Sequence, residues 1–461
     1  MFVGREDEMK TLKEKIESDS LEVGVIYGQR RIGKTSLINE VIKDYDHIYF
    51  LARDTNAQDN LNEFSAVLAR HFHLSALARF QSLDELFGRL FEEVDEKTVV
   101  VIDELPFLSK VYPGIISFFQ GFIDDRNRKG AAIKLLLSGS DSSFMVELLT
   151  DRAKPLYQRA TFQIHVGPLR FSDAIKMLDG FSDVDKARYL SIFGNRPYYL
   201  EKLKTEKSFD QNILDLCFDS TSILIDAPNI TLPIGYSSNS SYISILKAIA
   251  NRKHKIKEIS DALQIEDKVL STYLKRMLDA EAIEKRDVFN GNRKTVYYEI
   301  SDQFIRFYYS VVYPNLPNIE RGFKEEIYEI SKEKIERIVE HGFEDVTNSY
   351  IHELNIRHML PHVYQDIKKF VADNSTLNRS VEIDGLGESF DRKHLLIIEA
   401  KFRDKDISLE VLEHLKQSAS IFQGYESKTY YLISKRGFSD NIRSIEDSDV
   451  YMVTLDQMMD L

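Results

Sequence analysis

Cysteine is almost absent from this sequence of 461 residues, tryptophan is missing altogether, and no long apolar run occurs. The single cysteine, Cys217, cannot form a disulfide within the chain and cannot build a cysteine-based zinc site. No uninterrupted apolar stretch approaches the roughly 20 residues of a membrane helix. The charged residues that follow Met1 lack the apolar segment of a signal peptide. These absences predict a cytoplasmic protein without disulfides and without membrane spans.

The balance of charge is acidic, with a formal net charge of −13. Such a charge argues against a protein that is covered by nucleic acid over its whole surface. It is compatible with a local basic module, so charge has to be considered region by region. The length exceeds what one hydrophobic core accommodates, and roughly two to four domains are expected.

Apolar runs alternate with amphipathic helical stretches over residues 1–167. The runs are 23–27, 47–51, 98–102, 134–137 and 162–166. Continuous apolar strands are typical of a parallel sheet that is covered on both faces, so an α/β domain is predicted. The sequence after residue 167 predicts a helical region at 168–235, a third unit at 236–318 and a final α/β unit at 319–461. The Pro-, Gly-, Ser- and Asn-rich stretch 227–241 is interpreted as a linker.

Residues 28–35 match the phosphate-binding pattern G-x-x-x-x-G-K-[ST] in full, after an apolar run and before a helix. Gly28 and Gly33 allow the backbone to curl so that its N–H groups face phosphate oxygens, and the helix N-terminus adds positive potential. Lys34 is expected to reach the β- and γ-phosphates of ATP, and the Thr35 hydroxyl is expected to bind Mg²⁺. The predicted nucleotide-binding residues of this segment are Gly28, Gln29, Arg30, Arg31, Ile32, Gly33, Lys34, Thr35 and Ser36.

A second motif lies where the apolar run 98–102 ends in two carboxylates. Asp103 is expected to hold the Mg²⁺ shell, and Glu104 is expected to be the base that polarises the attacking water. Together the two motifs predict an ATP-hydrolysing enzyme. Ser140, after the next run, either senses the γ-phosphate or simply ends a strand. Arg159 is either an arginine finger or second sensor, or a solvated surface residue.

These motifs, together with residues 2–6 and 155–157, resemble the archaeal-type ATPases of the STAND/AAA-like group, which are related to origin-recognition ATPases. The resemblance covers nearly the whole chain and implies an ASCE-type core with a helical lid. It also implies that Gly4 and Arg5 help to seat adenine. The lid element Gly-Gly-x-Pro-x-Tyr-Leu is matched by residues 194–200, with Asn195 in place of the second glycine. Pro197 is retained, and the resemblance implies that it touches the nucleotide.

Residues 241–300 have the pattern of a winged helix-turn-helix. Three amphipathic helices are expected at 242–250, 256–263 and 267–280, followed by a hairpin around Asn290-Gly291-Asn292. The segment has twelve Lys/Arg and nine Asp/Glu, a net charge of +3. The residues expected to meet a DNA groove or phosphate are Ser271, Lys275, Arg276, Arg293 and Lys294. The alternative is a winged helix that serves only for packing or for assembly of a homo-oligomer.

The last unit contains an acidic residue, Asp384, and a predicted strand on which Glu399 and Lys401 share a face. Glu344, on an upstream helix, offers a third acidic group. Carboxylates can share a divalent cation such as Mg²⁺ while the ammonium orients or deprotonates a water, which is the minimum for metal-assisted phosphodiester hydrolysis. The alternative is a solvated Glu–Lys pair at the end of a strand.

Residues 335–461 resemble the PD-(D/E)xK restriction-endonuclease-like fold. In the ATPase family this region is a domain of unknown function with a nuclease-like core. Tryptophans often precede the acidic strand in that family, whereas Lys368-Lys369-Phe370-Val371 stands here. The first hypothesis is therefore an ATP-dependent DNA-processing enzyme. The second is a nucleotide-gated signalling or assembly scaffold with a silent C-terminal domain and a protein-binding winged helix, and a third is a transcription regulator.

Overall fold

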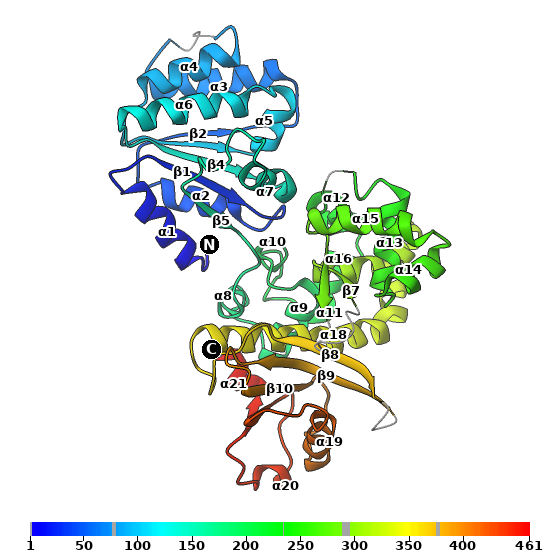
Figure 1. Ribbon diagram of the computed structural model, residues 1–461. Coiled ribbons are helices and arrows are strands. Elements are labelled where there is room, and N and C mark those ends of the chain that lie inside the picture. The colour runs from blue at the N-terminus through cyan, green and yellow to red at the C-terminus, as the bar shows by residue number, and fades with distance from the viewer. Residues whose placement is uncertain (1, 76–79, 234, 288–295, 375–378) are drawn as a thin grey trace. The chain divides into compact units, whose positions relative to one another are not determined.

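The computed structural model describes residues 2–75, 80–233, 235–287, 296–374 and 379–461 (Figure 1). The chain divides into two compact units, Met1–Gly167 and Pro168–Leu461. The division falls where the sequence predicts the end of the ATPase core. Among the described residues, no helix is both long enough and apolar enough to cross a membrane.

The first unit is built on a five-stranded sheet in the order β2-β3-β4-β1-β5, with all neighbouring strands parallel. Its strands are β1 (Glu22–Tyr27), β2 (His47–Leu51), β3 (Val99–Asp103), β4 (Lys134–Gly139) and β5 (Phe162–His165). Its helices are α1 (Glu6–Ile16), α2 (Lys34–Ile42), α3 (Ala57–His71), α4 (Leu83–Glu93), α5 (Leu105–Val111), α6 (Ile115–Lys129) and α7 (Ser142–Thr150). All five predicted strands are confirmed.

Side chains from both faces of this sheet are buried, which explains the continuous apolar runs. Along β3, Val100 and Ile102 join a cluster with residues of α3, α4 and α6. Val99 and Val101 join a second cluster with residues of α1 and α2. The parallel strands therefore end together at one edge of a sheet that is covered on both sides, and the loops beyond that edge can bring distant residues close.

The second unit begins with short helices and a three-helix segment. The helices are α8 (Phe171–Lys176), α9 (Asp183–Phe193), α10 (Pro197–Leu200), α11 (Phe209–Cys217), η1 (Ile223–Asp226), α12 (Ala227–Thr231), α13 (Ser240–Ala250), α14 (Ile256–Leu263) and α15 (Asp267–Asp279). The antiparallel pair β6 (Ile283–Asp287) and β7 (Val296–Ile300) follows. This is the element order predicted for a winged helix-turn-helix. The predicted turn Asn290-Gly291-Asn292 and the wing residues Arg293 and Lys294 lie outside the described residues.

The interpretation of 227–241 as a linker was wrong for its first part. Residues 227–231 form α12, in which Ala227, Pro228 and Thr231 are buried. A proline in the first turn of a helix is favourable because the N–H that it lacks would have no partner there. For the same reason the Pro-containing run 313–318 is helical. The run lies in the second half of a continuous helical stretch that consists of α16 (Gln303–Phe307), η2 (Tyr308–Val312), η3 (Tyr313–Asn315) and α17 (Leu316–Glu320).

The C-terminal part is a mixed sheet in the order β12-β11-β10-β9-β8, in which β8, β9 and β10 pair antiparallel and β10, β11 and β12 pair parallel. The strands are β8 (Lys368–Asn374), β9 (Arg379–Glu388), β10 (His394–Lys401), β11 (Ser427–Ser434) and β12 (Val450–Thr454). The helices are α18 (Lys324–Ile356), α19 (Leu409–Ala419), α20 (Asp440–Arg443) and α21 (Leu455–Met459).

The 33-residue helix α18 connects the parts of the second unit. Its buried residues Val339 and Phe343 belong to the same hydrophobic cluster as residues of α9, of α13 and of one face of the C-terminal sheet. The other face packs against α19. Because one cluster extends through all these parts, the domain limits at 235 and 318 remain predictions from the sequence.

Candidate functional sites

The segment that matches the phosphate-binding pattern is a tight loop between β1 and α2. Gly28 has φ of 150°, and a Cβ atom there would lie 2.2 Å from the carbonyl oxygen of Val166. Gly33 has φ of 99°, in the left-handed region that favours glycine. The two glycines therefore allow a curled backbone at the N-terminus of a helix, the arrangement that binds anions through N–H groups.

The Lys34 side chain lies within this loop. Its ammonium donates hydrogen bonds to the carbonyl oxygens of Gly28 and Gln29, each at 2.9 Å. The residue is buried, although an ammonium strongly favours water. The loop thus surrounds a positive charge at the place where the pattern predicts a polyphosphate.

Asp103 ends β3 at the same edge of the sheet and is fully buried. Its Oδ2 accepts hydrogen bonds from the Thr35 hydroxyl at 2.8 Å and from the Tyr49 hydroxyl at 2.6 Å. The structure therefore brings together Thr35 and Asp103, the two predicted Mg²⁺ ligands, whose oxygen donors suit this ion. No sequence motif singled out Tyr49, although it is the only residue with a hydroxyl group in the apolar run 47–51. Burial and the charge of Asp103 raise the pKa of Tyr49, so this phenol stays a hydrogen-bond donor.

Glu104 follows Asp103 with a left-handed φ of 55°. Its Oε2 accepts hydrogen bonds from the backbone N–H of Ser140 at 3.1 Å and from the Ser140 hydroxyl at 2.8 Å. The predicted base and the predicted γ-phosphate sensor are thus direct neighbours. Non-glycine residues in this backbone region are uncommon and cluster at functional sites.

The Arg5 side chain contacts the backbone of the phosphate loop. Its guanidinium donates to the carbonyl oxygens of Ile32 at 3.1 Å and Gly167 at 2.5 Å, and it pairs with Glu8. Gly4 and Arg5 both have positive φ immediately before α1. The role in seating adenine that the resemblance implies for Gly4 and Arg5 remains a prediction.

The other predicted residues of the loop are distributed around it. The guanidinium of Arg30 lies over the ring of Phe107, 5.9 Å from its centroid. Arg31 has a left-handed φ of 61°. Ser36 is exposed in the first turn of α2.

The structure does not bring Arg159 to the phosphate loop. Arg159 shortly precedes β5, and its guanidinium binds both carboxylate oxygens of Asp124 at 2.8 and 2.9 Å. It therefore lies at the amino-terminal edge of the sheet, whereas the loop follows the carboxyl end of β1. The six residues of β1 span about 20 Å. A sensor role at its own nucleotide is not supported, while a role at a neighbouring subunit remains a prediction.

Pro197 belongs to the second unit, where it begins α10. Next to it, Asn195 replaces the second glycine of the lid element. Its side-chain amide donates to the carbonyl oxygen of Leu169, and its own carbonyl accepts from the Leu169 N–H. The turn is therefore held by an asparagine without a second glycine. Contact between Pro197 and a nucleotide remains a prediction.

In the C-terminal sheet, Asp384 on β9 lies close to Glu399 and Lys401 on β10. The Lys401 ammonium forms an ion pair with Glu399 and is 3.7 Å from Asp384 Oδ2. The same Oδ2 accepts the N–H of Ala400 at 2.9 Å. The three residues predicted as catalytic are therefore adjacent. Burial raises the pKa of Asp384 to about 8, and the charges of Glu399 and Glu344 contribute to the increase.

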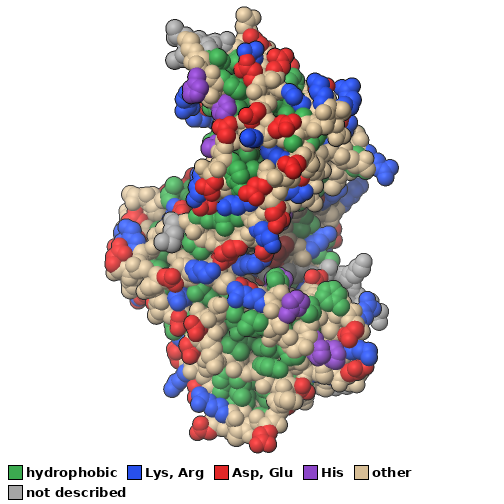
Figure 2. Space-filling model, turned by 90° about the vertical axis from the view of Figure 1, so that its left-hand side faces the viewer, with side chains coloured by type: hydrophobic (Ala, Val, Ile, Leu, Met, Phe, Trp, Pro, Cys, Tyr) green, Lys and Arg blue, Asp and Glu red, His purple; other side chains and the backbone are tan. Residues whose placement is uncertain are grey.

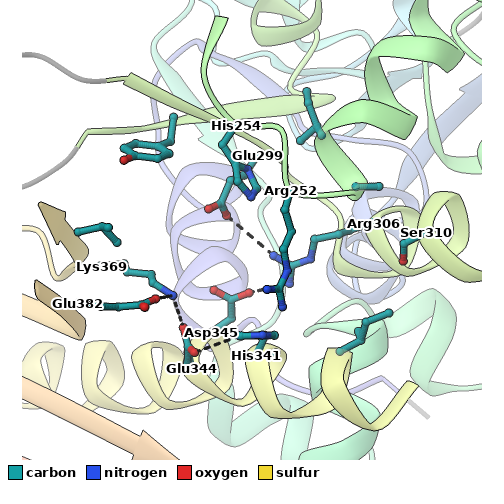
Figure 3. Close-up of a pocket in the computed structure, with 16 residues that line it drawn as sticks. Arg252, His254, Glu299, Arg306, Ser310, His341, Glu344, Asp345, Lys369 and Glu382 are labelled. Carbon is teal, nitrogen blue, oxygen red and sulfur yellow. Dashed lines mark hydrogen bonds and ion pairs between the residues drawn. The ribbon is translucent and has the colours of Figure 1, made fainter. Parts of the chain in front are cut away.

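Glu344, the expected third acidic ligand, has other partners (Figure 3). Its carboxylate binds the Lys369 ammonium at 2.7 Å and lies 3.4 Å from His341 Nδ1. Lys369 also binds Glu382 at 2.7 Å. Burial alone would lower the pKa of Lys369, but these two carboxylates raise it, so the lysine stays charged. Across the part of the chain that the structure describes, no three His, Cys, Asp or Glu side chains form a metal site. Asp384 and Glu399 remain as a candidate pair.

Two family models match parts of the chain, and the first of them extends beyond the first unit. Residues 2–203 match the family model of an ATPase domain found predominantly in Archaea, and residues 308–415 match a family described as archaeal and bacterial proteins of unknown function. The uncharacterized protein MJECL04 of Methanocaldococcus jannaschii is 30% identical over 468 residues, covering 99% of each chain.

Solved structures resemble the fold at low sequence identity. The Walker-type ATPase paby2304 of Pyrococcus abyssi aligns with a TM-score of 0.53 at 20% identity, over 67% of this chain and 96% of that one. The ORC2 protein of Aeropyrum pernix aligns with a TM-score of 0.44 at 14% identity, over 71% of this chain and 94% of that one. The match to the ATPase family model identifies the first unit as part of a P-loop ATPase domain, which implies nucleotide binding.

Proposed function

The chain belongs to the same family as the Methanocaldococcus protein and combines a P-loop ATPase domain with a domain of unknown function, and we propose that it is an ATP-driven DNA-processing enzyme. ATP hydrolysis with Mg²⁺ would take place in the first unit. The second unit would bind DNA through α13–α15 and the β6–β7 hairpin. It would cleave the DNA with the side chains of Asp384, Glu399 and Lys401. The observation that supports hydrolysis most directly is the convergence of Thr35, Asp103, Glu104 and Ser140.

The residues of the first unit suggest a division of labour. Lys34 is placed to exchange its carbonyl partners for the β- and γ-phosphates. Thr35 and Asp103 would hold Mg²⁺, which neutralises phosphate charge when it is bound. Glu104 would accept a hydrogen bond from the attacking water, and Ser140 would hold its carboxylate in place. The protein thereby contributes position and electrostatics to phosphoryl transfer.

The test is calorimetry with ATP together with a turnover assay. Lys34→Ala should abolish nucleotide binding, whereas Lys43→Ala, an exposed lysine paired with Glu40 just after the same helix, should not. Glu104→Gln should retain ATP and lower kcat by about 10²–10⁴-fold, the range for loss of a general base. Unchanged ATP affinity in Lys34→Ala would refute the site, and normal turnover in Glu104→Gln would remove that residue from the base role.

One observation in the second unit supports DNA binding. Ser271, Lys275 and Arg276 are exposed on α15. The face seen in Figure 2, which is not the side on which Figure 1 places α15, carries intermingled Lys/Arg and Asp/Glu side chains. We expect DNA contact to be local, as it is for a single recognition helix.

Metal-dependent cleavage of DNA, assayed on single-stranded oligonucleotides as well as on plasmid, tests the nuclease-like site. Lys401→Ala should abolish cleavage with Mg²⁺ or Mn²⁺. Lys393→Ala removes an exposed lysine that is paired with Glu426 just before β10, and it should leave cleavage intact. Equal activity of the two variants would exclude Lys401 as a catalytic residue.

A second candidate function is a nucleotide-gated scaffold with a silent C-terminal domain. It is favoured because two of the acidic residues already form ion pairs with lysines: Glu399 is paired with Lys401, and Glu344 is paired with Lys369. The absence of a three-ligand group among the described residues points the same way. Failure of the wild type to cleave DNA with either metal, with and without ATP, would favour this function.

A further inference from the structure

The second unit contains a cavity of about 300 Å³ that lies beside the nuclease-like site (Figure 3). One wall comes from the end of α13, the segment after it and β7. The opposite wall comes from α18, β8 and β9. Glu382 lines the cavity and precedes Asp384 by two residues on β9, so both side chains are on the same face of that strand. The cavity therefore adjoins both the winged-helix elements and the candidate catalytic residues.

The first wall presents an aromatic ring and a cation. Tyr297 on β7 is half-buried, with the ring of His254 at 6.4 Å and the ammonium of Lys255 at 5.3 Å from its ring centroid. Arg252 is exposed at the rim, has a left-handed φ of 66°, and pairs with no carboxylate among the described residues. An aromatic ring and a guanidinium without a carboxylate partner, lining the same cavity, are groups that can bind a base and its phosphate in single-stranded nucleic acid.

The opposite wall presents a cation that is held in place. The Lys369 ammonium is fixed between Glu344 and Glu382. Arg306, deeper in the cavity, is paired with Asp345 at 2.7 Å. Ser310 lines the same cavity from η2, a π-helical turn. π-Helical turns are rare and frequently mark functional sites.

The size of the cavity limits what can enter it. Its volume is at the lower end of the range for small-molecule sites, about 300–1,000 Å³. A nucleotide unit fits such a space, whereas an intact duplex, whose major groove alone is about 12 Å wide, does not. Asp384 is almost completely buried, so a duplex lying on the surface would not reach its carboxylate.

From these observations we propose that the cavity binds one nucleotide of a single-stranded DNA segment, with its base on Tyr297 and its phosphate near Arg252. Lys369 closes the far wall toward Glu344. The inference rests on the proposed DNA-processing function and specifies the substrate of the nuclease-like site as single-stranded tails or ends. The interior of a closed duplex would be excluded.

Binding is measured separately from cleavage, by fluorescence anisotropy of a labelled single-stranded oligonucleotide with the full chain in EDTA. Tyr297→Ala and Arg252→Ala should each weaken binding by at least about fivefold, the lower limit for the loss of a stacked base. Tyr297→Phe keeps the ring and should bind like the wild type. Tyr451→Ala removes an exposed tyrosine of β12 that is stacked on Tyr431, away from the cavity, and should also have no effect.

Failure of this inference can be distinguished from failure of the nuclease hypothesis. If single strands do not bind, or if Tyr297→Ala and Tyr451→Ala behave alike, the cavity is not the strand site, whatever the cleavage assay shows. If binding depends on Tyr297 but no DNA is cleaved with Mg²⁺ or Mn²⁺, the strand site stands and the nuclease hypothesis fails. Cleavage of covalently closed duplex as fast as that of single strands would overturn the substrate assignment. Thermal unfolding of each variant identifies any loss of folding.

Discussion

The Ser140 hydroxyl donates a hydrogen bond to the Glu104 carboxylate at 2.8 Å, across the carboxyl ends of two neighbouring strands. The residues are 36 positions apart, but the parallel pairing of β3 with β4 places Ile102 opposite Leu137, so their following residues meet. A candidate catalytic base is thereby held by a residue predicted to detect the γ-phosphate. A change at Ser140 should therefore affect hydrolysis through Glu104.

Ser140→Ala should lower kcat for ATP hydrolysis about tenfold or more while ATP affinity stays nearly unchanged. The substitution removes one of two hydrogen bonds to an ionised carboxylate, and such bonds contribute about 1.5–3 kcal/mol. Ser140→Thr retains a hydroxyl and should restore part of the rate. Turnover kinetics combined with calorimetry provide the measurement, and an unaltered kcat in Ser140→Ala would show that Glu104 does not need this bond.

Tyr49→Phe should raise the Mg²⁺ concentration needed for half-maximal ATP hydrolysis by about tenfold. The Tyr49 hydroxyl orients the same Asp103 oxygen that accepts from Thr35, and loss of a residue that orients a metal ligand typically weakens metal binding about 10–100-fold. Tyr45→Phe, which removes a hydroxyl bonded to Glu17 at the surface, is the matched control. Identical Mg²⁺ titrations for the two variants would argue against this role.

Glu353→Ala should destabilise the second unit by about 1–3 kcal/mol. The buried Glu353 carboxylate accepts hydrogen bonds from the Ser172 N–H at 2.8 Å and the Ser172 hydroxyl at 2.6 Å, at the N-terminus of α8, and it pairs with Arg357. Glu353→Gln keeps a hydrogen-bond acceptor and should lose less stability than Glu353→Ala. Thermal unfolding followed by circular dichroism measures the change, and equal midpoints for wild type and Glu353→Ala would contradict it.

The pH dependence of stability should reveal Asp384. Its folded pKa of about 8 lies above the ordinary aspartate pKa of about 4. Between these values the folded chain holds a proton that the unfolded chain releases, so the free energy of unfolding falls as the pH rises through this window.

Asp384→Asn removes this titration and retains an oxygen that can accept the Ala400 N–H. The decrease in melting temperature between pH 6 and pH 9 should therefore be smaller in Asp384→Asn than in the wild type, by a few degrees at roughly 2–4 °C per kcal/mol. Parallel melting curves at all pH values would show that Asp384 titrates normally.

Features that depend on neighbouring residues were predictable from the sequence. The phosphate loop at 28–35 is specified by glycines and a lysine at fixed spacing, and each strand of the first unit by a continuous apolar run. The meeting of Thr35 with Asp103 follows from a general property of parallel sheets, because strands that run the same way end at the same edge.

Features that depend on long-range contacts were decided only by the tertiary structure. The sequence showed Arg159 as a candidate sensor, but the structure pairs it with Asp124 at the amino-terminal edge of the sheet. Lys369 was not recognised as part of a site, because its position between Glu344 and Glu382 requires β8, β9 and α18 to pack together. Local sequence determines which residues form a helix, strand or loop, whereas pairing between distant charges depends on how those elements pack.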